Sequence, residues 1–400
     1  MKKTLYTILA LMFCVGALLC LGSAAWAETY SGTWGDYLSW TLDDTGLLTV
    51  SGSGGMPRAS RITEIPWYNY SDSIRSVVIG SNLLNISEHA FENCTMLESV
   101  TIPDGVLEID RKAFGACISL TEITIPASVT NIHYSAFDLC SALTAIDVAS
   151  SNTVYSSADG VLFRNGGETL FRCPEGKTGT YAIPSGVTSI DDYAFHFCDS
   201  LTSVTIPAGV TEIGDYAFDC CSSLESVTIS EGVTSIGEAA FYGCSGLTSV
   251  TIPSSVTSID NSAFFGCDSL TSVTFTGTQA EWNSISIGRD NEALTNADVH
   301  CITPDFVLPA ALTEIGEEAF QGGAFTFVKL PENAVAIGPR AFEDCPNLAY
   351  IYIPAAVTDI DANAFADVTG LAIIGAPNST VATYAQQHGF GFVPAATASE

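Results

Sequence analysis

Cysteine is the residue whose spacing first suggests chemistry. The 400-residue sequence holds 13 cysteines. Eight lie three residues after a phenylalanine, namely Cys94, Cys117, Cys140, Cys198, Cys221, Cys244, Cys267 and Cys345. In an exported chain such a series could form a disulfide framework. We favour buried free thiols, because Gly323 and Val368 occupy the same position and because side chains stacked in parallel oppose disulfide geometry.

Other reactive residues form no recognisable catalytic pattern. The sequence contains no nucleophile elbow, zinc-protease helix, phosphate-binding loop or EF-hand. The five histidines are scattered, and we interpret His133 and His196 as surface variation. Acid pairs such as Asp191-Asp192 carry little information in a chain with 44 acidic residues. We therefore expect no catalytic residues and no metal or cofactor.

The charge balance excludes two classes of partner. The chain has 44 acidic and 13 basic residues, a net charge of −31. Such a chain cannot neutralise phosphates, so we expect no nucleic acid and no anionic membrane surface as partner.

The N-terminus has the plan of a secretory signal peptide. Lys2 and Lys3 precede the apolar run 5–21, and Ala25-Trp26-Ala27 offers a small-x-small cleavage site. The alternative, a membrane anchor, needs about 20 spanning residues and would not need that site. We expect residues 1–27 to be removed, and the exported product to be extracellular or at the cell surface, without a transmembrane segment.

An internal repeat predicts the elements that position these residues. Ala-Phe pairs recur mostly 23 residues apart, with their phenylalanines at positions 91, 114, 137, 195, 218, 241, 264, 320, 342 and 365. Units this short cannot bury their own apolar residues, so they must stack into a solenoid. Two longer intervals, of 58 residues before Phe195 and 56 before Phe320, each predict an elaborated coil.

Each repeat predicts a strand and a turn. The segment 247–252 alternates and is rich in β-branched residues, which is typical of a short strand, and Pro253 ends it. Valine and isoleucine of that strand should point inward, and the Ala-Phe pair should lie opposite in a short turn or helical segment. The fold expected is a β-rich solenoid with a parallel concave sheet.

The repeat phrase also resembles a known family. Leu-x-x-Val-x-Ile-Pro, followed ten residues later by Ala-Phe-x-x-Cys, is similar to the BspA-like leucine-rich repeat of bacterial surface and secreted proteins. The resemblance covers about residues 70–375, and the phrases 35–50 and 281–283 resemble accessory modules of that family. It implies adhesion or protein recognition and no catalytic residues.

The departures from the repeat predict caps and elaborations. Residues 40–50 predict a capping hairpin with its turn at 43–46, and 379–388 predict a short helix that ends at Gly389. The expected segments are a signal peptide (1–27), a β-rich N-terminal cap (28–73), a solenoid (74–376) with elaborations at 150–180 and 276–301, and a C-terminal cap and tail (377–400).

The elaborations contain polar features of their own. The first predicts a hairpin around Asn165-Gly166-Gly167, and Arg164, Arg172 and Lys177 gather there as a small basic spot or a solvated hairpin. The second opens with a capping-box pattern at Thr278-Gln-Ala-Glu281 and contains Trp282. Asp290 and Glu292 lack the alternating oxygen ligands of a calcium loop.

The sheet surface offers the candidate binding residues. Most outward positions hold serine or threonine, as in Ser226/Thr228 and Ser249/Thr251. The C-terminal coils instead present aromatic and apolar residues, which favour binding. The candidates are Phe327, Lys329, Tyr350, Tyr352 and Ile373. Alternatively, the tail 384–393 folds over the two tyrosines and buries them.

Three functions are compatible with the sequence. The first is a secreted or surface-displayed recognition protein that binds a protein or glycan, host extracellular matrix included. The second is a passive spacer or envelope component. The third is a sugar-capturing protein or an enzyme acting through an elaboration, which requires polar groups converging near Trp282 or the Arg164 hairpin. The sequence does not specify an oligomeric state.

Overall fold

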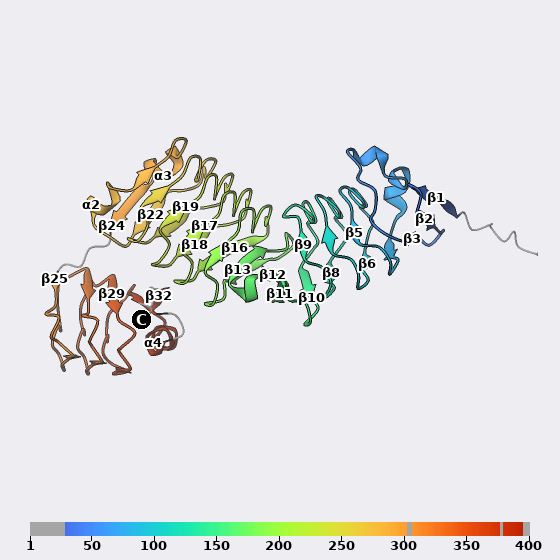
Figure 1. Cartoon of the computed structure of the whole chain (residues 1–400). Coiled ribbons are helices and arrows are strands. Elements are labelled where there is room, and N and C mark those ends of the chain that lie inside the picture. The colour runs from blue at the N-terminus through green and yellow to red at the C-terminus, as the bar shows by residue number, and fades with distance from the viewer. Residues whose placement is uncertain (1–28, 302–305, 377–378, 395–400) are drawn as a thin grey trace, which may run out of the picture.

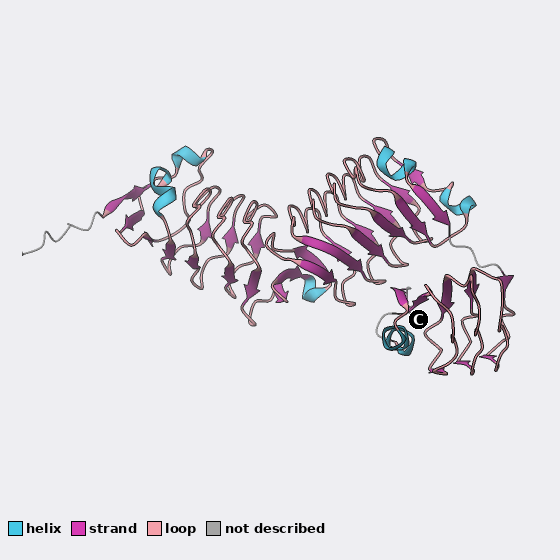
Figure 2. Cartoon of the chain, turned by 180° about the vertical axis from the view of Figure 1, so that it is seen from behind, coloured by secondary structure: helices cyan, strands magenta, loops and turns pink. Residues whose placement is uncertain are grey.

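A computed structural model describes residues 29–301, 306–376 and 379–394. The predicted signal peptide lies outside these residues. The chain winds coil after coil into a solenoid of short parallel strands (Figure 1). Helices are few and confined to the caps and elaborations (Figure 2). Within the described residues, no helix has the length and apolar character needed to cross a membrane.

The N-terminal cap is built from antiparallel strands, as the sequence predicts. β1, β2 and β3 pair antiparallel, and β3 then pairs in parallel with β4, which joins the cap to the first coils. In the β2–β3 turn the Asp43 carboxylate accepts hydrogen bonds from the backbone of Thr45 and Leu47, both at 3.0 Å. The sheet contains β1 (Tyr30–Trp34), β2 (Leu38–Leu42), β3 (Leu47–Gly52), β4 (Ser76–Ile79) and β6 (Ser99–Thr101). Two 3-10 turns, η1 (Ile62–Glu64) and η2 (Tyr68–Ser73), follow β3.

The main strands of the following coils form three further sheets, which come after the sheet of the N-terminal cap along the solenoid. A pair contains β8 (Glu122–Ile125) and β10 (Ala145–Val148). A six-stranded sheet contains β14 (Gly179–Ala182), β16 (Leu201–Ile206), β18 (Ser226–Ile229), β20 (Ser249–Ile252), β22 (Ser272–Phe275) and β24 (Asp298–Cys301). The last contains β25 (Phe306–Val307), β27 (Phe327–Lys329), β29 (Tyr350–Ile353), β31 (Ala372–Gly375) and β32 (Gly391–Pro394). All these strands pair in parallel, and successive valines face one another, as Val204, Val227 and Val250 do.

A second column of very short strands runs beside the first. One sheet contains β5 (Asn85–Ile86), β7 (Glu108–Ile109) and β9 (Asn131–Ile132). The next contains β11 (Tyr155–Ala158), β12 (Val161–Arg164), β13 (Thr169–Arg172), β15 (Ser189–Ile190), β17 (Glu212–Ile213), β19 (Ser235–Ile236), β21 (Ser258–Ile259) and β23 (Ser286–Ile287). The third contains β26 (Glu314–Ile315), β28 (Ala336–Ile337) and β30 (Asp359–Ile360).

The Ala-Phe pair forms the turn opposite the sheet. The backbone N–H of Phe218, for example, donates a hydrogen bond to the carbonyl of Ala240 in the next coil, at 2.7 Å. This close approach of two backbones explains the small alanine. The phenylalanine rings stack inside with centroids 4.5 Å apart between Phe195 and Phe218 and 5.0 Å apart between Phe218 and Phe241. Trp67 of the cap continues the same stack onto Phe91 at 5.7 Å.

Among the described residues, the interior divides into three large cores, besides a small cluster around Phe327 and Ile374. The N-terminal core extends from Trp34 to Phe171, the central core from Val161 to Cys301, and the C-terminal core from Leu308 to Phe392. The first elaboration separates the first two. In its hairpin β12–β13, closed by the 3-10 turn η3 (Asn165–Gly167), alternate residues serve different cores. Val161 and Phe163 pack into the central core, whereas Leu162 and Phe171 pack into the N-terminal core.

The second elaboration and the tail also follow their sequence signals. α2 (Gln279–Trp282) begins with the predicted capping box between Thr278 and Glu281, and α3 (Glu292–Asn296) follows. α4 (Thr380–His388) has Ser379 as its N-terminal cap and Gly389 as its C-terminal cap. Gly389 adopts the left-handed conformation that favours glycine. β32 then extends the C-terminal sheet.

Candidate functional site

The C-terminal strands bring most of the predicted binding residues onto one face. Phe327 pairs with Tyr350, and Lys329 pairs with Tyr352, so all four side chains point outward from β27 and β29. Tyr350 and Tyr352 are half-buried and Lys329 is exposed, whereas Phe327 is only 7% exposed. The accessible part of this surface is therefore the two tyrosines and the lysine.

Ile373 does not belong to this surface, and its prediction was wrong. It pairs with Ile351 and is fully buried in the C-terminal core. Its neighbour Ile374 pairs with Tyr352 and takes the outward position instead. In the other coils the inward residue of the strand follows the repeat leucine by three positions, which from Leu371 predicts Ile374. Here the inward residue is Ile373, one position earlier, and a shift of one residue exchanges the two faces of a strand.

Polar contacts hold the outward residues in place. The hydroxyl of Tyr352 donates to Glu332 at 3.1 Å, and the Lys329 ammonium lies 4.9 Å from the centre of the Tyr352 ring. Burial raises the pKa of Tyr352, and the nearby Glu332 carboxylate adds to this effect. The tail does not fold over this surface as a flap, because β32 continues the sheet and α4 packs against the end of the core. Val393 of the tail still contacts the cluster around Tyr350 and Tyr352.

The three basic residues of the first elaboration do not form a common basic spot. Arg172 is buried with a side chain only 2% exposed, and its guanidinium pairs with Glu175 at 2.9 Å and Asp138 at 3.1 Å. Lys177 pairs with Asp159 at 2.8 Å. Each charge is therefore neutralised locally, and Arg172 is an internal residue rather than part of a solvated hairpin.

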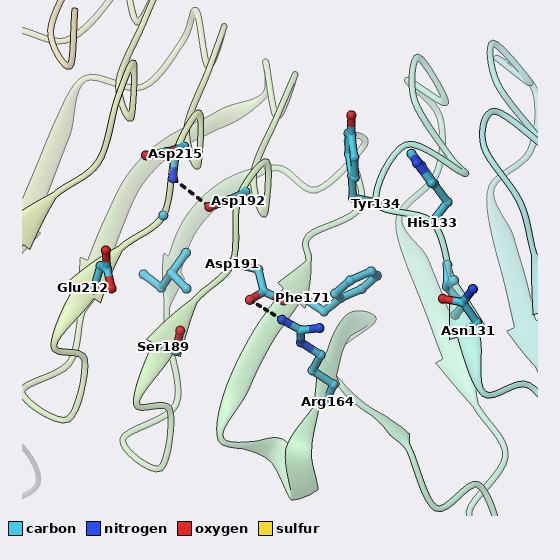
Figure 3. A pocket seen from close by; sticks show the side chains of 13 residues that line it. Asn131, His133, Tyr134, Arg164, Phe171, Ser189, Asp191, Asp192, Glu212 and Asp215 are labelled. Carbon is cyan, nitrogen blue, oxygen red and sulfur yellow. Dashed lines mark hydrogen bonds and ion pairs between the residues drawn. The ribbon is translucent and has the colours of Figure 1, made fainter. Parts of the chain in front are cut away.

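The same elaboration creates a groove on the side of the short strands. β9 is the last strand of its sheet, and its Ile132 N–H donates to the Tyr155 hydroxyl at 3.0 Å instead of to a further strand. The regular stacking thus stops at β9 and resumes at β13 and β15. A groove of 510 Å³ lies at this interruption (Figure 3). We name it the Arg164 groove; its lining includes Asn131, Tyr134, Arg164, Phe171, Asp191 and Asp215.

An ion pair lies at the centre of the Arg164 groove. Arg164 Nη2 donates to Asp191 Oδ1 at 2.7 Å, and the guanidinium carbon lies 5.6 Å from the centre of the Phe171 ring (Figure 3). The Arg164 side chain is 43% exposed, whereas that of Asp191 is 16% exposed. Burial raises the pKa of Asp191, and the neighbouring Arg164 opposes that shift.

The rim of the groove carries acids and an aromatic side chain. The Asp192 carboxylate accepts the backbone N–H of Asp215 at 2.9 Å, and the Asp215 carboxylate accepts that of Glu238 at 2.8 Å. Tyr134 is 44% exposed and stacks on Tyr193 with ring centres 4.8 Å apart. Beside Tyr134, desolvation lowers the pKa of His133. The groove therefore brings carboxyl groups, one guanidinium, an imidazole and a phenol together.

Sequence reasoning named Arg164 but missed the residues that line the groove with it. Tyr134, Phe171 and Asp191 come from different coils, and the only available signal was their position within or next to the long interval between Phe137 and Phe195. His196, interpreted as surface variation, is in fact largely buried and pairs with Asp219 at 3.1 Å. Trp282 is buried in the central core and does not gather polar groups.

The stacked coils of short parallel strands define a leucine-rich-repeat solenoid. The sequence profile described as the BspA type leucine rich repeat region matches residues 62–162, 167–287 and 296–391. The chain belongs to this family, as its repeat phrase predicts. No functionally curated protein matches the chain at a significant level.

Solved structures of bacterial leucine-rich repeat proteins are similar to the chain. A leucine-rich repeat protein from Eubacterium ventriosum is 22% identical, with 86% of this chain and 95% of that chain covered and a TM-score of 0.43. A leucine rich cell surface protein from Faecalibacterium prausnitzii is 26% identical, with 64% and 97% covered and a TM-score of 0.34. A protein from Bacteroides ovatus is 21% identical, with 90% and 98% covered and a TM-score of 0.40.

Proposed function

We propose that the chain is a non-catalytic recognition protein, secreted or displayed at the cell surface, that binds a protein or glycan over its repeats. The observation that carries this proposal is the Arg164 groove, where the uniform surface of the solenoid is interrupted and polar and aromatic side chains converge. Membership of a repeat family typical of bacterial surface proteins supports the same function. Solenoid repeats commonly offer extended binding surfaces.

The acids of the groove support recognition rather than catalysis. A glycosidase needs two carboxyl groups free to act as acid and as base or nucleophile. Here one oxygen of Asp191 is bound by Arg164, and Asp192 and Asp215 each accept a backbone N–H of the following coil. The Asp191 contact therefore joins the elaboration to the next coil, and the other two contacts join successive coils. We expect no turnover of bound glycans.

The C-terminal surface is a second candidate region for binding. Tyr350, Tyr352 and Lys329 are accessible to different degrees on neighbouring strands. Tyrosine is enriched at binding hot spots because it offers apolar area with a polar tip. Binding there would suit a flat protein surface, such as a component of the host extracellular matrix.

The test is binding of residues 28–400 to arrays of extracellular-matrix proteins and glycans. Wild type is compared with Arg164→Gln, with the double variant Tyr350→Ser, Tyr352→Ser, and with Tyr37→Ser as control, because Tyr37 is 76% exposed in the N-terminal cap. We expect wild type and the control to bind the same components selectively, and we expect one of the two site variants to bind them more weakly.

Each outcome decides between functions. Binding that neither site variant changes would keep recognition and move the site elsewhere. Absence of binding to every array would contradict recognition and favour a structural spacer. Release of reducing ends from a bound glycan would contradict a non-catalytic role.

A further inference from the structure

The Arg164 groove combines features that restrict the chemistry of its ligand. Its centre is an arginine–aspartate pair, so a ligand meets both charges side by side. The Arg164 guanidinium donates a single hydrogen bond to the described residues, although such a group can donate five. Arg164 Nε and Asp191 Oδ2 are buried and have no hydrogen-bond partner among the described residues. Unpartnered buried polar atoms cost stability, which indicates that folding alone does not account for this pair.

Charge excludes anionic ligands from the groove. Asp191, Asp192, Glu212 and Asp215 line it together with the single cation Arg164. An anion would meet three uncompensated negative charges in a chain whose net charge is −31. Phosphorylated and sulfated ligands are therefore disfavoured.

A cationic ligand fits the groove less well than its acids suggest. The Asp192 and Asp215 carboxylates already accept backbone N–H groups, and Arg164 pairs with Asp191 beside them (Figure 3). Within the described residues, no group of three or more His, Cys, Asp and Glu side chains is arranged to hold a metal ion. A bound cation would thus find carboxylate oxygens that are not arranged as a metal site, and it would be repelled by Arg164, which is already paired with Asp191.

A ligand with uncharged hydroxyl groups matches the hydrogen-bonding groups of the groove that are still free. Arg164 offers donors, Ser189 a hydroxyl, and Glu212 acceptors that are exposed to solvent. A hydroxyl both donates and accepts, so two neighbouring hydroxyls can meet a guanidinium and a carboxylate at once. Ile190 and Phe171 provide apolar lining between these groups. A sugar ring, which combines vicinal hydroxyls with an apolar face, has this pattern.

A row of tyrosines begins at the groove. Tyr134, which lines the groove, Tyr193 and Tyr216 form stacked rings with centres 4.8 and 5.0 Å apart. The stacking covers four of the six ring faces in the row. A polymer that enters the groove can extend along this row, whereas a single small sugar cannot, so the arrangement suits a segment of a polymer.

We propose that the Arg164 groove binds a neutral polysaccharide, whose hydroxyls contact Arg164 and the neighbouring carboxylates and whose ring lies near Phe171 and Tyr134. This inference rests on the proposed recognition function and names the ligand class of its principal site. A basic protein segment is the alternative that the same experiment examines.

The experiment is affinity electrophoresis of residues 28–400 in native gels that contain one polymer each. The neutral probes are α-mannan, laminarin and galactomannan, heparin is the anionic probe, and the cationic probe is chitosan. Arg164→Gln and Tyr134→Ala test the groove. Arg340→Gln is the matched control, because Arg340 is 44% exposed and also pairs with carboxylates, those of Glu317 and Glu318.

We expect retardation by at least one neutral polysaccharide, with the dissociation constant raised about tenfold by Arg164→Gln, the loss of roughly one charge-assisted hydrogen bond. Tyr134→Ala should also weaken binding, and Arg340→Gln should not. Circular dichroism checks folding; should Arg164→Gln fail to fold, the exposed Tyr134 still tests the groove.

Three results would overturn the inference. Retardation by chitosan or heparin alone would assign the groove to a charged ligand. Neutral binding that both groove variants leave unchanged would place the sugar elsewhere. Binding to a protein array without any neutral polysaccharide binding would keep recognition and refute this ligand class, whereas no binding to any array or gel would refute both proposals.

Discussion

The most consequential single residue outside the groove is Arg172. Its guanidinium joins three segments, because it donates to Glu175 within the elaboration, to Asp138 in the preceding coil and to the Tyr193 carbonyl in the following coil, the last at 2.8 Å. Glu175 in turn accepts the Leu139 N–H at 2.9 Å. This buried network connects the N-terminal and central cores at the point where their regular stacking is interrupted.

Arg172→Ala should therefore destabilise the chain strongly. Removing the cation leaves the buried Glu175 and the part-buried Asp138 without their shared partner, and breaking a buried pair in this way typically costs about 3–5 kcal/mol. The measurement is the urea midpoint followed by circular dichroism. Arg75→Ala is the control, since Arg75 is 52% exposed in its pair with Glu98 and such pairs contribute about 0–1 kcal/mol. Equal midpoints for the two variants would contradict the role given to Arg172.

Glu175 should make this network sensitive to pH. Burial raises the pKa of Glu175 from its usual 4.5 to about 7, and Arg172 only partly opposes the shift. The folded state thus holds the proton more tightly than the unfolded state, so stability from this group is complete below pH 4.5 and is lost as the pH rises toward 7. Glu175→Gln cannot ionise, and the stability of this variant relative to wild type should increase across that interval. A stability difference that is independent of pH would refute the predicted titration.

At the scale of elements, the turn opposite the sheet explains the cysteine series. The thiol of Cys244 donates to the Phe218 carbonyl at 3.1 Å, and Cys221 and Cys267 make the same contact with the phenylalanine one coil before them. The phenylalanine carbonyl already accepts a backbone N–H within its own turn, as that of Phe218 does from Cys221 at 3.3 Å. The small thiol of the next coil fits against it and adds a second, weak hydrogen bond. The described cysteines are unpaired in this structure, and the free thiols favoured from the sequence stay a prediction.

Alkylation with iodoacetamide should separate buried from accessible thiols. Burial raises the pKa of Cys94 to about 12 and also raises the pKa values of Cys117, Cys198, Cys244 and Cys345, so these thiols form little reactive thiolate at about pH 8. In the native chain we expect slow labelling of the half-buried Cys220 and Cys301 alone, detected by mass spectrometry of peptides. Guanidinium without reductant should make the other described cysteines reactive. Thiols that stay unlabelled in guanidinium until a reductant is added would reveal disulfides instead.

The elements show what periodicity can and cannot predict. Strands and turns follow from the sequence because each coil repeats the same contacts, and the capping signals at Thr278 and Ser379 are local. The register of Ile373 was wrong because two adjacent isoleucines fit the apolar pattern equally well. The Arg164 groove could not be predicted, since Tyr134 and Asp191 meet only through the irregular path of the elaboration between them.

At the scale of the whole molecule, three cores predict unfolding in more than one step. A solenoid is stabilised mainly by contacts between neighbouring coils, so an interruption weakens the cooperativity between its parts. The tryptophans distinguish the cores. Trp34, Trp40 and Trp67 lie in the N-terminal core and Trp282 in the central core, whereas the C-terminal core contains none.

The variant Phe342→Ala should show that the C-terminal core unfolds separately from the other two. Phe342 is fully buried between Phe320 and Phe365, with ring centres 5.2 Å from both, and its truncation should cost about 3–5 kcal/mol in the C-terminal core. The urea transition seen by circular dichroism should then gain an early step, while the tryptophan fluorescence transition stays in place. Phe218→Ala, in the central core, is the matched control and should move the fluorescence transition of Trp282. If Phe342→Ala shifted both signals together, the chain would be unfolding as one cooperative unit, and the C-terminal core would depend on its neighbour for stability.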